Sequence, residues 1–413
     1  MTLTGRADTA PAHVRFNPFA SAFRRNPYPD YERLRTLSPV HRTLGMWVLT
    51  RHSDVRHVLR DSMFSAALIP ELVSAHTARY GREDPVAVRR TGTTSLVFTD
   101  DPEHARLRGL ANQIFSTRAI SSLHEHVRVT AETLLRNAVH TCASVDVIAD
   151  YAAHLPITVI CEWMNLPASM RPDIGRWTHD IRFLLEPTLM TAADLDRVHA
   201  VVDAFTVALQ HVIDARRDHP GTDLISRMLT ATTASDELSV DEIVVLCIMC
   251  FVAGNETTTA LIGNTSLALL SRPDLVTALR TGTLPVRALI DESVRYESPL
   301  QMTKRVATAD TEIDGHVVHA GDQLLLCLGA ANRDPDVFDR PDDFDPARTG
   351  AKHVGFGHGM HRCLGALLAH MQAEIAVETL FTQYDPRRID AAALQWQTRS
   401  SIVRGLAHLP VTL

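Results

Sequence analysis

Apolar residues recur three and four positions apart over much of the chain, which is the spacing of amphipathic α-helices. The longest such segment runs from Ser239 to Leu270. Ser239 and Glu242 stand three residues apart at its start, as in a capping box, and so predict the helix N-terminus. The same spacing predicts shorter helices at residues 30–37, 120–139 and 195–217 and in the run after Cys363.

Strand-like patterns are rarer and shorter. They predict strands at residues 46–51, 312–329 and 401–413, with Gly or Asp at the turns. Residues 332–352 are dense in Pro and Asp and predict an ordered but irregular coil, and so long a coil usually serves a site. The whole pattern predicts a mainly α fold with small β-sheets, of the α+β class.

The chain has 413 residues, 45% of them hydrophobic, and its middle contains neither a linker-like stretch nor an internal repeat. We therefore expect one domain over residues 1–413. The formal charge of -7 disfavours a nucleic-acid partner. The N-terminal segment lacks the apolar core of a signal peptide, and the longest apolar run, residues 243–254, is shorter than the about 20 residues that span a bilayer. We expect a cytoplasmic protein without a membrane partner.

Candidate chemistry centres on one of the six cysteines. The other five lie in apolar surroundings, where a reduced cysteine behaves as a small hydrophobic residue, and nothing suggests a disulfide framework. Cys247 and Cys250 form a C-x-x-C inside a predicted apolar helix, which packing explains.

Cys363 lies in the stretch FGHGMHRCLG, residues 356–365, directly before a helical run. A helix N-terminus favours a thiolate, the three glycines allow the backbone to approach a flat group, and His361 and Arg362 can face anions. A thiolate ligand to haem iron explains this composition. From these residues alone, a structural cysteine or a catalytic nucleophile stays open.

The same stretch resembles, at every fixed position, the haem-binding signature of cytochromes P450, and the resemblance extends over nearly the whole chain. It implies the cytochrome P450 fold of the soluble bacterial type. It also implies haem b (iron protoporphyrin IX), with Cys363 as the thiolate ligand of the iron and Phe356 among the haem-binding residues.

Three further motifs follow the family's order and carry implied roles. In AGNETTT, residues 253–259, Glu256 matches the family's acid and Thr257 its catalytic threonine, which would handle protons where O2 binds. Hydroxyl groups in mid-helix also compete for backbone carbonyls and can open the helix locally. Glu292 and Arg295 match the ExxR pair and Arg348 its third member, with a structural role.

The remaining matches concern the haem propionates and the substrate. The propionate positions are matched by His104, Arg108, Arg305 and His361. By analogy of position, we expect the substrate pocket to include Val252, Ala253, Leu300 and Ile402, with further contacts from residues 65–98 and 182–190.

The resemblance implies a monooxygenase that activates O2 to hydroxylate or epoxidise a small organic substrate in bacterial natural-product biosynthesis. No flavin or nicotinamide domain is visible, so electrons would come from a separate ferredoxin and ferredoxin reductase, docking near His358 and Arg362. One alternative is oxidative coupling, which forms C–C, C–N or C–O bonds without inserting oxygen. The acid–Thr pair disfavours direct use of peroxide and also a haem protein that only carries electrons or senses a gas. A haem-free cysteine hydrolase is disfavoured further.

Overall fold

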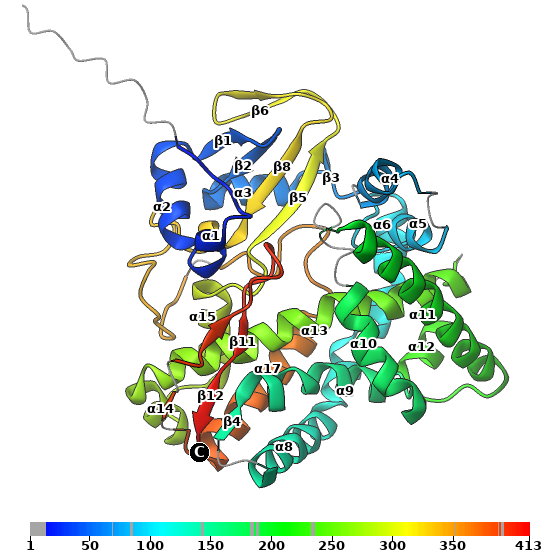
Figure 1. The fold of residues 1–413 in the computed structure, drawn as a ribbon, viewed down its shortest axis with the longest axis vertical. Helices are drawn as coiled ribbons and strands as arrows, with labels where there is room; N and C mark the ends of the chain where they lie inside the picture. Colours follow the sequence, from blue (N-terminus) through cyan, green and yellow to red (C-terminus); the bar gives the residue numbers. More distant parts are fainter. Residues whose placement is uncertain are drawn as a thin grey trace, which may run out of the picture.

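The computed structural model describes residues 14–67, 69–82, 86–141, 144–181, 186, 190–232, 236–350, 352–386, 388–389 and 392–413. A β-rich region lies above a larger helical region in Figure 1. Helices form most of the regular structure and the strands form small sheets, which confirms the α+β class.

The largest sheet has five strands in the order β1-β2-β8-β5-β3. Its strands are β1 (Val40–Thr43), β2 (Met46–Leu49), β8 (Gln323–Cys327), β5 (Met302–Ala307) and β3 (Phe64–Ser65). β2 pairs with β8 in parallel, and the other neighbours are antiparallel. The strand predicted at 46–51 is therefore confirmed, and the segment 312–329 forms β8 together with the hairpin of β6 (Thr311–Ile313) and β7 (His316–Val318).

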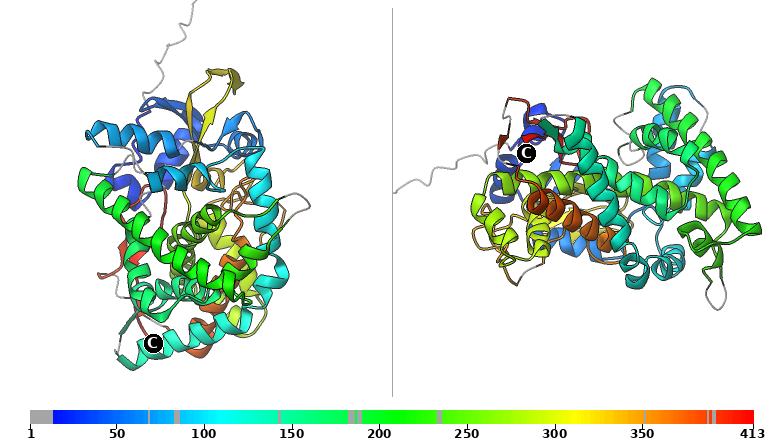
Figure 2. Two further views of the ribbon diagram at one scale, coloured as in Figure 1. Left: turned by 90° about the vertical axis from the view of Figure 1, so that its right-hand side faces the viewer. Right: turned by 90° about the horizontal axis from the view of Figure 1, so that it is seen from below.

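Helix α13 (Val240–Leu270) is the central element of the helical region, and both hydrogen bonds of the capping box between Ser239 and Glu242 are present. It contacts α9 (His154–Trp163), α11 (Ala192–Asp218), α15 (Val286–Tyr296) and α17 (Ala366–Gln383). The right-hand view of Figure 2 shows α17, in orange, beside the yellow-green α13 that it contacts. A helix that is apolar on all sides is expected to be enclosed by other elements, and the four helices around α13 do this.

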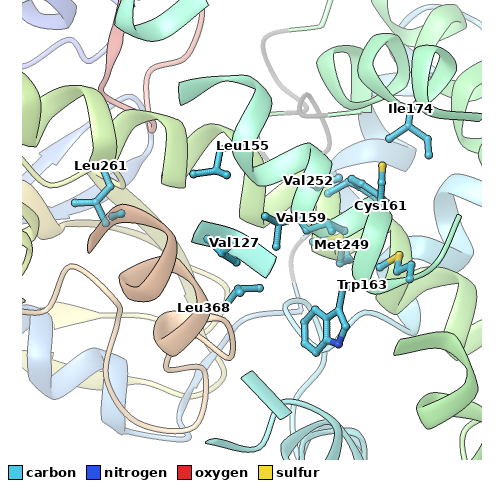
Figure 3. Packing of buried hydrophobic residues seen from close by; sticks show 14 of the residues in the cluster. Val127, Leu155, Val159, Cys161, Trp163, Ile174, Met249, Val252, Leu261 and Leu368 are labelled. Carbon is cyan, nitrogen blue, oxygen red and sulfur yellow. The ribbon is translucent and has the colours of Figure 1, made fainter. Parts of the chain in front are cut away.

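Buried side chains from several of these helices meet around α13. Figure 3 shows Leu155 and Val159 of α9 beside Met249 and Val252 of α13, with Leu368 of α17 nearby. By length and hydropathy α11 and α13 could each cross a membrane, although we expected no such segment from the apolar run of residues 243–254. In α13, 56% of the apolar window is buried inside the protein, as in the core helix of a soluble protein.

The remaining elements connect and cover these two regions. The other helices are α1 (Ser21–Arg25), α2 (Tyr28–Leu37), α3 (His52–Arg60), α4 (Ile69–Arg79), α5 (Val86–Thr93), α6 (Glu103–Ile114), α7 (Thr117–Ser121), α8 (His124–Thr141), α10 (Arg171–Ile181), α12 (Leu224–Thr230), α14 (Pro273–Arg280) and α16 (Leu328–Ala331), with a π-helix at Val147–Ala152 and a 3-10 turn at Ala168–Met170. The other strands are β4 (Ser144–Asp146), β9 (Arg388–Ile389), β10 (Gln395–Trp396), β11 (Leu406–His408) and β12 (Pro410–Thr412).

Two of the predicted elements are interrupted by serine side chains. The helix predicted at 120–139 is divided between α7 and α8, and the Ser122 hydroxyl donates to the carbonyl of Ala119 at 2.7 Å where the first helix ends. The strand predicted at 401–413 begins only at Leu406, because the Ser400 hydroxyl accepts from the N–H groups of Ile402 and Val403 and holds a turn. Local bonds of this kind compete with regular structure.

Candidate active site

A cavity of about 420 Å³ lies between α13 and the loop that precedes α17. Ala253 and Thr257 line it from α13, and Phe356 and Cys363 line it from the loop. The structure thus brings the cysteine motif and the acid–Thr motif, which are about a hundred residues apart in sequence, to opposite sides of one space.

The cysteine loop is held by its own backbone and by a close approach to α3. The Cys363 N–H donates to the carbonyl of Phe356 at 2.9 Å. Gly357 and Gly359 both have φ of +72°, a conformation that glycine adopts without strain. A Cβ on Gly359 would lie 2.5 Å from the backbone oxygen of Leu59, so only glycine fits there.

The chain alone does not ionise Cys363 easily, which corrects the expectation from the sequence. Cys363 is exposed on the cavity wall, but the protein around it reduces its solvation and so raises the pKa of the thiol, although the Gly365 N–H and the charges of Arg108 and Arg362 lower it. Helix α17 begins at Ala366, so the sulfur lies just outside the helix terminus. A thiolate here therefore calls for a cation, because metal binding displaces the thiol proton.

Three basic groups near this loop are only partly satisfied within the described structure. The His104 and His361 rings lie 4.3 Å apart, and Nε2 of His104 and both nitrogens of His361 make no hydrogen bond there. Carboxylate oxygens lie farther off, at 3.7 Å from Nδ1 of His104 (Asp101) and 3.8 Å from Nε2 of His361 (Asp100). Arg305 on β5 is 6% exposed and donates to the backbone oxygen of Lys304 at 2.7 Å, and no ion pair joins it to a carboxylate of the described residues. Burial lowers the pKa of Arg305 to about 10 and that of His361 to about 4.

Arg108 stands apart from these three because its guanidinium is already engaged. Its Nη1 donates to the Arg362 carbonyl at 2.7 Å and its Nε to Asn112 at 3.2 Å. It lines the cavity from α6 and ties that helix to the cysteine loop.

The acid–Thr segment keeps the regular helix. The Thr257 hydroxyl donates to the carbonyl of Ala253 at 2.7 Å, yet α13 continues without a break to Leu270, so the expected local opening is not present. Glu256 is half-buried and does not line the cavity, whereas the neighbouring Thr258 does.

The ExxR residues form a buried ion pair that anchors the coil. Arg295 donates to both oxygens of Glu292, at 2.7 and 2.8 Å, and to the carbonyls of Asn332, Pro341 and Asp343. Nε of Arg348 lies 3.6 Å from Glu292, while its Nη atoms bond to coil carbonyls. The expected coil is thus ordered over its described residues, 332–350 and 352.

The predicted substrate residues differ in whether they line the cavity. Ala253, Leu300 and Ile402 line the cavity. Val252 does not: it is 3% exposed and packs into the core seen in Figure 3, because one position along a helix turns the side chain by about 100°. Of the two candidate segments, 65–98 contributes Ala66, Thr94, Leu96, Val97 and Phe98, whereas in 182–190 all but Glu186 and Met190 lie outside the described residues, and Glu186 lines the cavity.

Sequence reasoning missed several residues of the cavity wall. Cys250, assigned to packing, lines the cavity, and so do Trp163 of α9 and Lys304 of β5. Lys304 is one of two lysines in the chain and directly precedes Arg305. This rarity and this position could have marked it as a candidate for the cavity wall.

Haem fits this set of residues. The cavity offers a thiol on one wall, and Nε2 of His104, Nε2 of His361 and the buried guanidinium of Arg305 could each donate to a carboxylate. Buried polar groups without partners are rare in folded proteins, and the two propionates of a haem would supply the missing acceptors.

Comparison with known proteins agrees with this chemistry. The profile of the family Cytochrome P450 matches residues 162–391. The "Biotin biosynthesis cytochrome P450" of Bacillus subtilis is 33% identical, over 95% of this chain and 98% of the relative. The "6-deoxyerythronolide B hydroxylase" of Saccharopolyspora erythraea is 32% identical, over 94% of this chain and 96% of the relative. Among solved structures, P450BioI in complex with an acyl carrier protein that carries hexadec-9Z-enoic acid has a TM-score of 0.86 at 31% identity, covering 95% of this chain and 99% of that one.

Proposed function

The chain belongs to the cytochrome P450 family and is a haem monooxygenase, and we propose that its cavity holds haem b with Cys363 as the thiolate ligand. The supporting observation is that Cys363 faces the same cavity as Thr257, near the buried Arg305, which pairs with no carboxylate of the described residues. His104 and His361 lie near the same loop, and their Nε2 atoms make no hydrogen bond in the described structure. No other cysteine of the described residues combines a glycine-rich loop with such neighbours.

The basic residues near the loop would hold the propionates. Arg305 stays charged at neutral pH because its pKa, although lowered by burial, is about 10. His104 and His361 are neutral there, since burial lowers the pKa of both, and a neutral ring can donate one hydrogen bond. Arg108 would join them from α6, and Phe356 would pack against the macrocycle.

When bound, haem supplies the activation of O2 and the transfer of one oxygen atom to the substrate. The chain's own residues would deliver protons and exclude water. The Thr257 hydroxyl can leave the Ala253 carbonyl and donate into the cavity, and Glu256 would pass protons to it through water. Glu292, Arg295 and Arg348 would act structurally, by fixing the coil.

The substrate and partners follow from the relatives and the charge pattern. Because one relative is a cytochrome P450 of biotin biosynthesis and another a 6-deoxyerythronolide B hydroxylase, we propose a bacterial biosynthetic oxidation. Electrons would come from a ferredoxin and its reductase in the cytoplasm, docking near His358 and Arg362, which lie on the cysteine loop. The sheet region and the helical region line one cavity, which supports a single domain over residues 1–413.

The absorption spectrum of the reduced protein with carbon monoxide tests the ligand. A Soret band shifted far to the red is expected for a thiolate opposite the gas. Cys363→Ala should abolish this band, whereas Cys250→Ala, which removes a second thiol from the same cavity, should keep it. A red-shifted band that survives Cys363→Ala would exclude Cys363 as the ligand.

The role of Thr257 has a separate test. Thr257→Ala should keep the red-shifted band but send a larger share of the supplied electrons to hydrogen peroxide. Thr258→Ala is the matched control, because Thr258 also lines the cavity on the next helical position. Equal peroxide yields from the two variants would remove Thr257 from proton delivery.

A further inference from the structure

Lys304 lines the cavity from β5, next to Arg305 in sequence but on the other side of the strand. Side chains of successive strand residues point to opposite faces. Lys304 stands opposite Leu325 of β8, and Leu325 clusters with Met302, two residues before Lys304. Lys304 and Arg305 both line the cavity but from opposite faces of the strand, and the apolar Met302 and Leu325 lie on the Lys304 face.

The ammonium group of Lys304 has no acceptor among the residues that the structure describes. No hydrogen bond or ion pair joins it to them, and the side chain is half-buried. Burial lowers its pKa, and Glu186 raises it from a distance beyond ion pairing. The oxygens of Glu186 are already occupied by the Ser401 N–H at 2.9 Å and by the hydroxyls of Ser400 and Ser401.

The surroundings of this lysine are suited to the body of an amphipathic molecule. The cavity is lined mainly by apolar side chains, among them Met46, Met302, Leu325 and Ile402, although the polar Glu186 and Ser401 also line it. An ammonium group offers three donors and a full charge, and its hydrogen bonds to a carboxylate are stronger than those between neutral groups.

We propose that Lys304 binds the carboxylate of the substrate, so that the enzyme oxidises the apolar part of an organic acid held at its charged end. The inference rests on the proposed function, because it takes the cavity to be the oxidation site. It adds a substrate class and a residue that selects it. A lysine whose ammonium merely reaches water along an apolar wall is the competing explanation.

Calorimetric titration of the haem-loaded protein with dodecanoate and with methyl dodecanoate separates the two explanations. Lys304→Gln should weaken dodecanoate binding about tenfold and leave the ester unchanged, because only the acid loses a charge-assisted bond. Lys304→Arg should retain most of the affinity. Lys352→Gln is the matched control, since Lys352 is the other lysine and is exposed in the coil.

Three results would overturn the proposal: equal affinity of Lys304→Gln and the unchanged protein for dodecanoate, an equal loss in Lys352→Gln, or no binding of either ligand. The reduced spectrum with carbon monoxide, recorded for each variant, keeps this test separate from the proposed function. A missing red-shifted band in the unchanged protein would reject the haem-thiolate assignment, whereas a normal band with unselective binding would reject only the role of Lys304.

Discussion

Two groups of ionisable side chains lie near the cysteine loop, and they differ in how the protein satisfies them. On the side of α15, Glu292 is held by Arg295, which also bonds to three backbone carbonyls of the coil. On the side of β5, Arg305 has no carboxylate partner among the described residues, and the nearby His361 has no hydrogen bond from either ring nitrogen.

The difference separates side chains that are paired within the protein from side chains whose partner a ligand would supply. A buried charge that is paired in place stabilises one arrangement of the chain, and removal of one partner leaves the other uncompensated. A buried donor without an acceptor costs stability until a ligand supplies one. The first group should therefore control folding, and the second should control cofactor binding.

Arg295→Met tests the paired group and should have the largest effect. It removes both hydrogen bonds of Arg295 to the buried Glu292 carboxylate and leaves only Nε of Arg348, 3.6 Å away, which costs about 3–5 kcal/mol of the free energy of unfolding. Urea unfolding of the variant and the unchanged protein measures the difference. A loss below about 1 kcal/mol, the usual value for a surface pair, would mean that the pair of Glu292 and Arg295 does not control folding.

His370 lies beside the cysteine loop, and its protonation tests whether this part of the folded protein tolerates an added positive charge. Its ring lies 5.0 Å from that of Phe356 and faces Asp291, Glu374, His353 and Arg287, with Arg362 nearby. Burial lowers its pKa to about 4, against about 6.5 in the unfolded chain. The unfolded chain therefore binds the proton first as the pH falls.

The resulting stability is complete above about pH 6.5 and is lost as the pH falls toward 4, by about 3 kcal/mol in total. His370→Gln removes this titration but keeps a neutral polar side chain. Urea unfolding between pH 7 and pH 4.5 should show a steeper loss for the unchanged protein than for the variant. Parallel losses would mean that His370 is protonated in the folded state.

Two glycines of the loop between the groups give a matched pair of substitutions. Gly357 and Gly359 share a φ of +72°, so alanine costs about 1 kcal/mol at either position. Gly359→Ala also drives a Cβ to 2.5 Å from the Leu59 oxygen, whereas the nearest atom to a Cβ on Gly357 is 3.6 Å away. We expect Gly359→Ala to lose about 1–2 kcal/mol more in urea unfolding. Equal losses would show that α3 does not constrain the loop.

Arg305→Met tests the unpaired group and should have the smallest effect on folding. The haem-free variant should be at least as stable as the haem-free unchanged protein, because a buried charge without a carboxylate partner is removed. The loaded variant should release haem to an acceptor protein about tenfold faster, as expected for loss of one charge-assisted bond. A strongly destabilised haem-free form would place Arg305 with the structural charges instead.

The sequence by itself determined the central helix, its N-terminus at Ser239, the cysteine loop and the α+β class, because periodicity, capping and glycine-rich turns are local properties. The resemblance of its motifs also located the ExxR pair, whose i, i+3 spacing on one helix already brings the partners together.

Only the tertiary structure decided which side chains face the cavity. Val252 and Ala253 are adjacent in sequence, yet one packs in the core and the other lines the cavity. Lys304 and Glu186 reach the same wall from a strand and a distant segment, and no local pattern encodes that meeting. Burial is a sum over neighbours from the whole chain, and a local sequence pattern does not contain those neighbours.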